Sequence, residues 1–391
     1  MNKNAMKKRL SGPVAAMVFF LLFVGQAMAS ASWPHEKSDL KPDPNVVWGK
    51  LENGFRYVLM KNKEPKDRVS MHLNVQAGSL NEREDERGVA HFLEHMLFNG
   101  SENFEPGELV KYFQSIGMQF GPDANARTGL DETVYDIILP NGDMKSIEDG
   151  LLVLKDYAQG ALILEEQVDS ERKIILAEKR SRDSASYRTF EETFEFEFPE
   201  SLISKRLPIG DEEVIASADR KLLKGFYDAW YRPEKMMIVM VGNFEPAVAE
   251  SLIKEKFSDM VARAPARPEP DLGKLRHFGI KPFYHYEEDS GDASVSVEVL
   301  EMTGRRPDSA SLKETILKKD IADAIVQNRL DRILRKPDVP FTGASIRSGL
   351  IFNEILTAEI SARSSEENWE KSLAAIEQEL RRAIQIGRAH V

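Results

Sequence analysis

The chain contains no cysteine and only 7 histidines among its 391 residues. The absence of cysteine excludes disulfide bonds, thiolate nucleophiles and cysteine-ligated zinc, so any metal site must use His, Asp or Glu. Basic residues are in the minority, with 53 Lys and Arg against 64 Asp and Glu, which gives a net charge of −11. We therefore expect no nucleic-acid partner, because binding a phosphate backbone requires a basic face.

Long apolar runs are also absent, except at the N-terminus. Basic residues at positions 3 to 9 precede the apolar run from Val14 to Gly25, which Ala27-Met28-Ala29 follows. These are the parts of a secretory signal peptide. The run is shorter than the roughly 20 residues that a membrane-spanning helix needs. We therefore expect a signal peptide over residues 1–29, no stable membrane anchor after its removal, and a soluble protein, most simply of the bacterial periplasm.

Behind a lead-in over residues 30–45, apolar patterns with strand and helix periodicity alternate. They predict a hairpin over 48–60, strands over 69–75, 133–139 and 236–241, and helices over 89–98, 106–116, 144–158, 164–182 and 220–230. This alternation indicates a mixed α/β domain, which we expect to span residues 46–261.

Residues 262–273 are predicted to form a linker, because residues 262–272 contain three prolines and no periodic apolar face. Beyond the linker, strands are expected over 294–300 and 351–361, and helices over 309–334 and 367–386. The order of strand then helix restarts there, so we expect a second, related α/β domain over residues 274–391. This domain is shorter than the first and the sequence stops directly after a helix, so we expect it to be incomplete.

His91-Phe92-Leu93-Glu94-His95 is the segment richest in chemical information. On a helix, residues four apart lie on one face and direct two imidazoles at one ion. A catalytic zinc takes three protein ligands and a water, and a neighbouring carboxylate accepts the proton of that water. The order H-x-x-E-H is the signature of the inverted zinc peptidases. The alternative is an amphipathic helix whose histidines form ordinary hydrogen bonds.

A third metal ligand must come from another segment, and the predicted helix after Leu164 offers four glutamates. Glu171 and Glu178 are seven residues apart, so they face the same side of that helix. Glu165 and Glu166 are interpreted as solvated charges. The residues alone leave the choice between Glu171 and Glu178 open.

The segment from Gly88 to Gly100 resembles the insulinase/pitrilysin family of zinc peptidases almost residue for residue. Further blocks resemble the family in the same order along the chain: Gly78-Ser79, Asn125-Ala126-Arg127-Thr128 with Asp131, Thr133 and Tyr135, Trp230-Tyr231-Arg232-Pro233, and Val241-Gly242-Asn243. The resemblance implies an α+β fold made of mixed α/β-roll domains, one complete and one apparently incomplete.

The resemblance also implies roles for individual residues. His91, His95 and Glu178 would hold one zinc ion per chain, with Glu94 as the catalytic base. Glu171 would orient a histidine ligand through its second ring nitrogen. Asn125 and Ala126 would contact a peptide substrate that binds as an added strand.

The function implied is that of a zinc-dependent endopeptidase that hydrolyses peptides or unfolded polypeptides, with Glu94 as general base on a zinc-bound water. Full-length members of the family consist of two halves, and this chain resembles the first. We therefore expect a missing C-terminal half or a partner subunit. The alternatives are a non-catalytic or partner-dependent binding subunit of the same family, and a half-length peptidase that works as a dimer.

Overall fold

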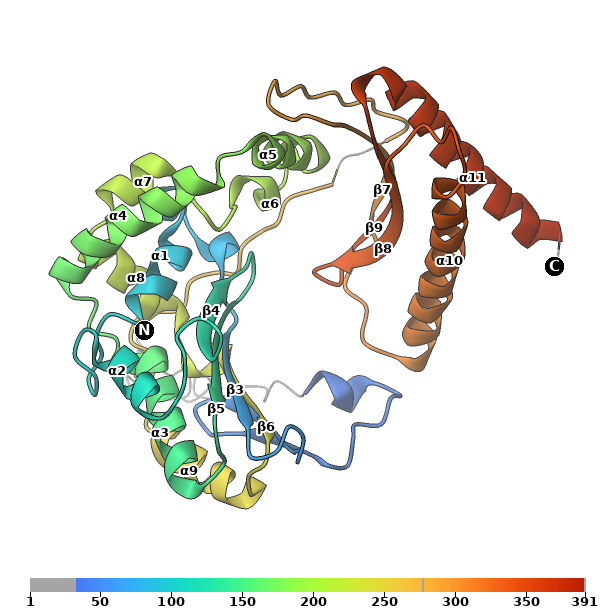
Figure 1. The fold of residues 1–391 in the computed structure, drawn as a ribbon. Helices are drawn as coiled ribbons and strands as arrows, with labels where there is room; N and C mark the ends of the chain where they lie inside the picture. The colour runs from blue at the N-terminus through green and yellow to red at the C-terminus, as the bar shows by residue number, and fades with distance from the viewer. Residues whose placement is uncertain (1–32, 276–277, 390–391) are drawn as a thin grey trace, which may run out of the picture.

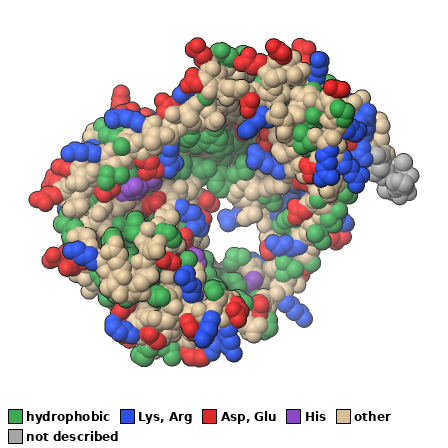
Figure 2. Space-filling view, in the orientation of Figure 1, with side chains coloured by type: hydrophobic (Ala, Val, Ile, Leu, Met, Phe, Trp, Pro, Cys, Tyr) green, Lys and Arg blue, Asp and Glu red, His purple; other side chains and the backbone are tan. Residues whose placement is uncertain are grey.

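Two β-sheets, each covered by helices on one side, lie on opposite sides of an open space (Figure 1). The computed structural model describes residues 33–275 and 278–389, so the predicted signal peptide lies outside the described residues. The N-terminal unit contains a six-stranded sheet and the C-terminal unit a three-stranded sheet. We call the space between the two units, visible in Figure 2, the hollow. Within the described residues, no helix has the length and apolar character needed to cross a membrane.

The six-stranded sheet has the strand order β1-β2-β6-β3-β5-β4. Its strands are β1 (Val46–Lys50), β2 (Arg56–Lys61), β3 (Val69–Val75), β4 (Ala124–Thr128), β5 (Thr133–Leu139) and β6 (Met236–Gly242). Neighbouring strands are antiparallel except β2 and β6, which are parallel. Among the described strands β4 pairs only with β5, so one edge of β4 is free.

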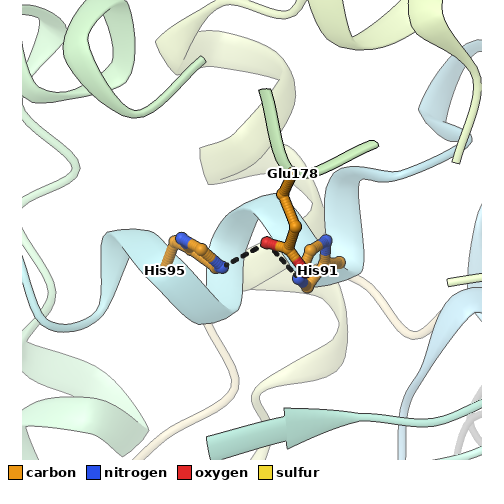
Figure 3. Close-up of side chains that lie close together, drawn as sticks. All are labelled: His91, His95 and Glu178. Carbon is orange, nitrogen blue, oxygen red and sulfur yellow. Dashed lines mark ion pairs between the residues drawn. The ribbon is translucent and has the colours of Figure 1, made fainter. Parts of the chain in front are cut away.

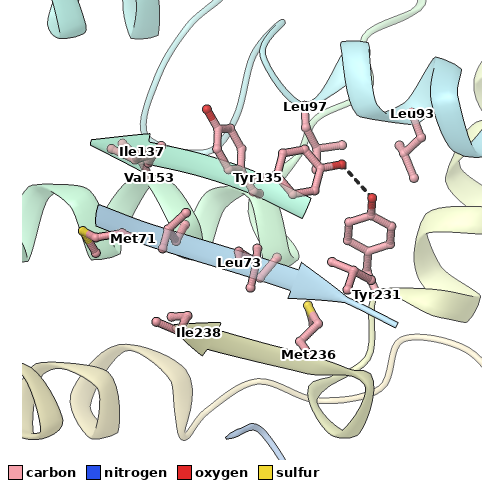
Figure 4. Packing of buried hydrophobic residues seen from close by; sticks show 14 of the residues in the cluster. Met71, Leu73, Leu93, Leu97, Tyr135, Ile137, Val153, Tyr231, Met236 and Ile238 are labelled. Atoms are coloured by element: carbon pink, nitrogen blue, oxygen red, sulfur yellow. Dashed lines mark hydrogen bonds between the residues drawn. The ribbon is translucent and has the colours of Figure 1, made fainter. Parts of the chain in front are cut away.

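Alternation along the strands separates a buried face from the face that lines the hollow. In β3, Met71 and Leu73 are fully buried, whereas Ser70 and His72, which alternate with them, are partly exposed. Figure 4 shows buried side chains of β3, β5, β6 and the helices above them in one continuous cluster. Burial of each large apolar side chain in this way stabilises the folded state by roughly 1.5–3 kcal/mol of free energy. The sheet is therefore a rigid base for the helices on its buried face.

Nine α-helices belong to the described part of the N-terminal unit. They are α1 (Val89–Met96), α2 (Glu108–Ser115), α3 (Met144–Lys155), α4 (Glu165–Arg182), α5 (Ala185–Glu197), α6 (Leu202–Lys205), α7 (Glu212–Ser217), α8 (Arg220–Trp230) and α9 (Pro246–Phe257). The five helices predicted from periodicity are confirmed. The sequence patterns missed α5, α6, α7, α9 and the short strand β4.

The C-terminal unit is a sheet of order β7-β9-β8 with two long helices on one face. Its elements are β7 (Ala293–Met302), α10 (Ala310–Leu334), β8 (Gly343–Ile351), β9 (Ile355–Ser364) and α11 (Trp369–Ala389). The prediction of one strand over 351–361 was wrong at its start, and β8 was missed. Phe352 and Asn353 have φ angles of 53° and 56° and form the turn between β8 and β9. Phe-Asn lacks the glycine or proline that marks most turns, although Asn tolerates this conformation.

Besides the chain connection, contacts near both ends of the hollow join the units. Phe198 and Ile203, near the ends of α5 and α6, form a buried cluster with Ile355 of β9. At the other end of the hollow, the Asp39 carboxylate of the lead-in accepts a 2.7 Å hydrogen bond from the Ala310 N–H at the start of α10. The hollow is therefore bounded by contacts at both ends.

Candidate metal centre

Helix α1 carries the H-x-x-E-H segment, and its first turn is held from outside the helix. The Glu82 carboxylate accepts hydrogen bonds from the N–H groups of Gly88 (3.0 Å) and Ala90 (2.8 Å). Gly88 has a φ of 102°, and a Cβ there would lie 3.1 Å from the Gly210 Cα. Burial raises the pKa of Glu82 to about 8, while the two backbone N–H groups act to lower it. A buried acid and an obligatory glycine therefore fix where α1 begins.

Three side chains from α1 and α4 converge as the pattern predicts (Figure 3). The Glu178 Oε2 atom lies 3.7 Å from His91 Nε2 and 3.5 Å from His95 Nε2. The three candidate ligand atoms all lie within 4.8 Å of one another. Ligand atoms around a tetrahedral zinc with bonds of about 2.1 Å are about 3.4 Å apart. Two imidazole nitrogens and a carboxylate oxygen at these separations therefore fit a zinc ion.

The environments of the two histidines differ. Burial, followed by the nearby His95, lowers the pKa of His91 to about 4, so its imidazole is neutral at pH 7 and offers a lone pair. The His91 Nδ1 atom is buried and has no hydrogen-bond partner within the described part of the chain. Burial is the largest influence on His95 and acts to lower its pKa, but the Glu171 carboxylate, 3.2 Å from His95 Nδ1, and the charges of Glu94 and Glu178 together raise it. Glu171 therefore lies where it can orient His95.

Glu94 points into the same pocket and is 8% exposed. Burial raises its pKa, and the hydrogen bond that Thr128 Oγ1 donates to Glu94 Oε2 acts in the opposite direction. Thr128 is on β4, so this bond ties the edge strand to α1. A buried carboxylate with a raised pKa is a stronger base than an exposed one.

The hydrogen-bond pattern of β4 determines which backbone groups face its free edge. The carbonyl of Asp123, just before β4, accepts from Ile138 N–H of β5. Alternation along an antiparallel strand then turns the N–H and C=O groups of Ala126 away from β5. The Asn125 Oδ1 atom accepts the Ala126 N–H at 2.9 Å. Ala126 thus offers a main-chain donor and acceptor at the free edge, and its donor is covered by the neighbouring side chain.

One pocket of about 310 Å³ gathers the predicted residues. Its lining comprises His91, Glu94, His95, Asn125, Ala126, Arg127, Thr128, Glu178, Arg182, Pro208 and Ile209. Glu171 lies behind His95 and is absent from this lining. A larger depression of about 490 Å³ near the start of α8 is lined by side chains of both charges and contains no histidine. The pocket at α1 is therefore the candidate site.

The sequence analysis assigned no role to five residues of this lining: Arg127, Thr128, Arg182, Pro208 and Ile209. Thr128 belongs to the Asn-Ala-Arg-Thr block, and its bond to Glu94 was not inferred. Arg127 precedes Thr128 in the same block and also lines the pocket. Arg182 follows Glu178 by one helical turn and forms an ion pair with Glu178. The spacing of four residues between Glu178 and Arg182 was the available signal for this pair.

Comparison with known proteins agrees with this geometry. The family described as insulinase (peptidase family M16) matches residues 57–194, and the M16 inactive domain matches residues 217–388. A curated relative, the probable zinc protease PqqL of Escherichia coli strain K12, is 34% identical over 250 residues, which are 64% of this chain and 26% of the relative. The chain thus spans about a quarter of that relative's length.

Solved structures have the same fold. The first half of the periplasmic protease PqqL from Escherichia coli aligns with a TM-score of 0.75 and 27% identity, covering 87% of this chain and 73% of that chain. Pitrilysin aligns with a TM-score of 0.62 over 85% of this chain and 35% of that chain, at 20% identity. The mixed α/β architecture is therefore that of the insulinase/pitrilysin fold.

Proposed function

The chain belongs to the insulinase family of M16 peptidases, and we propose that it carries the zinc site and catalytic base of an endopeptidase acting on peptides or unfolded polypeptides. The observation that carries this proposal is the convergence of His91, His95 and Glu178 in one pocket with Glu94. The naming of relatives as zinc proteases supports the same metal and the same class of reaction.

In the proposed mechanism, His91, His95 and Glu178 would hold one zinc ion, and Glu171 would orient His95 through Nδ1. Zinc in such a site acidifies water and polarises a carbonyl group. Glu94 takes up the proton of the attacking water and returns it to the departing amine nitrogen, so that the peptide C–N bond breaks and a carboxylate and an amine remain. Thr128 keeps the Glu94 carboxylate aimed into the pocket.

We propose that the substrate binds as an additional strand on the free edge of β4. Ala126 presents its N–H and C=O to this edge, and the Asn125 side chain must release the Ala126 N–H when a substrate carbonyl takes it. Recognition through main-chain groups depends little on the substrate's side chains, but it requires a peptide whose own backbone groups are free.

The proposed setting of the enzyme follows from its relatives. PqqL is described as periplasmic, which supports a secreted protein whose residues 1–29 are removed. Because curated relatives are much longer, we propose that a second half or a partner subunit completes the enzyme. Proposed domain limits are residues 46–261 and 274–391 with a linker over 262–273. The second family match starts at residue 217, but β6 (236–242) belongs to the first sheet.

The test is hydrolysis of an unstructured fluorogenic peptide by the zinc-loaded chain together with the second half or partner subunit that completes it. We expect a chelator to abolish cleavage and added zinc to restore it. Glu94→Gln should keep the bound zinc and lower the rate about 10²–10⁴-fold, because the amide cannot take up a proton. Glu166→Gln, which alters an exposed glutamate of α4, is the matched control and should cleave normally.

Wild-type cleavage by Glu94→Gln would contradict the assignment of the base. A completed enzyme that binds zinc but leaves every peptide intact would instead support the non-catalytic binding subunit.

A further inference from the structure

Two arginines flank the substrate edge, one on each face of the sheet. Arg127 is on β4, and its guanidinium contacts Asp136 on the face that lines the hollow. Arg182 is in the last turn of α4, on the side of the metal ligands, and pairs with Glu178. Both side chains line the candidate pocket, and they are 60% and 49% exposed.

Each arginine is anchored while part of its guanidinium stays free. Arg127 Nη1 donates to Asp136 Oδ2 at 2.9 Å, and the other oxygen of Asp136 contacts His72 Nδ1. Arg182 donates through Nη2 to the Glu178 carboxylate. A guanidinium has five N–H donors, so each side chain keeps donors for a further acceptor. Anchoring reduces the conformational entropy that is lost when a ligand binds.

An added strand would bring its side chains to both arginines. Successive side chains of a strand point to opposite faces of the sheet. Next to Ala126, the side chains on the hollow face therefore come beside Arg127, and those on the opposite face come to the side of Arg182. A substrate carboxylate on either face would therefore lie where it can accept a charge-assisted hydrogen bond from Arg127 or Arg182.

Basic side chains, interspersed with acidic ones, also lie around the hollow (Figure 2). Although the net charge of the chain is −11, Lys and Arg side chains lie on several sides of the hollow (Figure 2). On the C-terminal sheet, Ile360 and Ala362 pack in the cluster with the helices, so Arg363, which follows Ala362, faces away from α10 and α11 and lies 3.9 Å from Asp292. The Arg363 side chain is 70% exposed. A cleft with cations on several sides attracts an anionic ligand.

We infer that Arg127 and Arg182 make this site selective for acidic polypeptides, with Asp or Glu side chains on both faces of the bound strand near the cleaved bond. The inference rests on the proposed binding of substrate at the β4 edge. It assigns to Arg127 a role in specificity that is separate from zinc binding, since Arg127 contacts none of the candidate ligands.

The experiment measures binding, so that it does not depend on catalysis. Three fluorescein-labelled host peptides, identical except for four positions that carry Asp, Asn or Lys, are titrated with the zinc-loaded chain and followed by fluorescence polarisation. Every protein in the series carries Glu94→Gln, so cleavage is prevented and the charge change at position 94 cancels in the comparison. We expect the Asp peptide to bind most tightly, and Arg127→Gln to reduce its advantage over the Asn peptide about three- to tenfold.

Arg68→Gln is the matched control, because Arg68 is a half-exposed arginine paired with Asp123 beside the same strand but outside the pocket. It should leave the preference unchanged. Arg182→Gln should also reduce the preference, with zinc content measured in parallel because Arg182 contacts a metal ligand. Equal affinity for the Asp and Asn peptides, or a preference that survives in the Arg127→Gln, Arg182→Gln double variant, would overturn the inference. A failure of all three peptides to bind would instead remove the proposed edge site itself.

Discussion

At the scale of single residues, the two glutamates of α4 have different geometry although the chain pattern treats them alike. Glu178 Oε2 lies between the Nε2 atoms of both histidines, whereas Glu171 approaches only His95, from its Nδ1 side. Because they are seven residues apart, Glu171 and Glu178 lie on the same face of α4. The three-dimensional arrangement distinguishes them: Glu178 is a candidate metal ligand, and Glu171 lies behind the ligand His95.

This difference predicts unequal losses of zinc. Glu178→Gln should leave the purified chain without zinc after dialysis, because a charged ligand is removed. Glu171→Gln should weaken zinc binding about 10- to 100-fold, as is usual for a group that orients a ligand. Metal analysis with competition by a chelator measures both. Full zinc content in Glu178→Gln with loss in Glu171→Gln would reverse the two assignments.

At the scale of elements, the start of α1 depends on Glu82, a residue outside the helix. Glu82→Ala would leave the Gly88 and Ala90 N–H groups buried without partners, so we expect the free energy of unfolding to fall by about 1–3 kcal/mol. Urea unfolding measures this loss. Asp85→Ala is the control, because Asp85 is exposed and forms only a surface ion pair, and it should change stability by less than about 0.5 kcal/mol. Equal effects of the two changes would show that the helix start does not depend on Glu82.

The edge strand allows a second test at this scale. Proline at position 126 removes an N–H that faces away from β5, so Ala126→Pro should preserve the ladder and the fold while lowering peptide affinity at least about tenfold. Asn125→Pro removes an N–H that faces β5 and should instead destabilise the protein. Thermal unfolding and peptide binding, measured on both variants, separate the two effects. Unchanged peptide affinity in Ala126→Pro would place the substrate elsewhere.

The sequence predicted the elements with strong periodicity, and the motif spacing predicted that His91 and His95 share one helix face. The choice of Glu178 as the third candidate ligand came from the family resemblance and not from spacing. The hydrogen bond between Thr128 and Glu94 depends on how β4 lies against α1. The ring contact between Phe98 and Phe120 likewise joins two separate segments. No local sequence pattern predicts either contact. Helix α5 was missed because its aromatic residues pack at the junction with the C-terminal unit as well as on their own unit, so they form no simple apolar stripe. Tertiary contacts of this kind are outside the reach of periodicity.

At the scale of the whole molecule, β4 is at the edge of its sheet and lies beside the hollow between the two units (Figure 1). We expect an extended substrate to reach β4 through this space. Two contacts at opposite ends, the Phe198–Ile355 cluster and the Asp39–Ala310 hydrogen bond, bound this space. Access to the edge strand therefore depends on how much of a substrate can enter the hollow and unfold its backbone there.

We therefore predict that the complete enzyme cuts unfolded polypeptides and spares folded domains. The substrate for the test is one small domain in two forms, a stable parent and a destabilised point mutant that is unfolded under the assay conditions. A folded domain already uses its main-chain donors and acceptors internally, so it cannot add a strand to β4. With a parent stability of about 5 kcal/mol, only about one molecule in several thousand is unfolded, and cleavage should be slower by about 10³-fold or more. An unrelated protease with an open groove, assayed on both forms, controls for differences in cleavable sequence. Equal rates on the two forms, measured while the parent unfolds too slowly to supply the reaction, would mean that neither the edge strand nor the hollow selects the substrate.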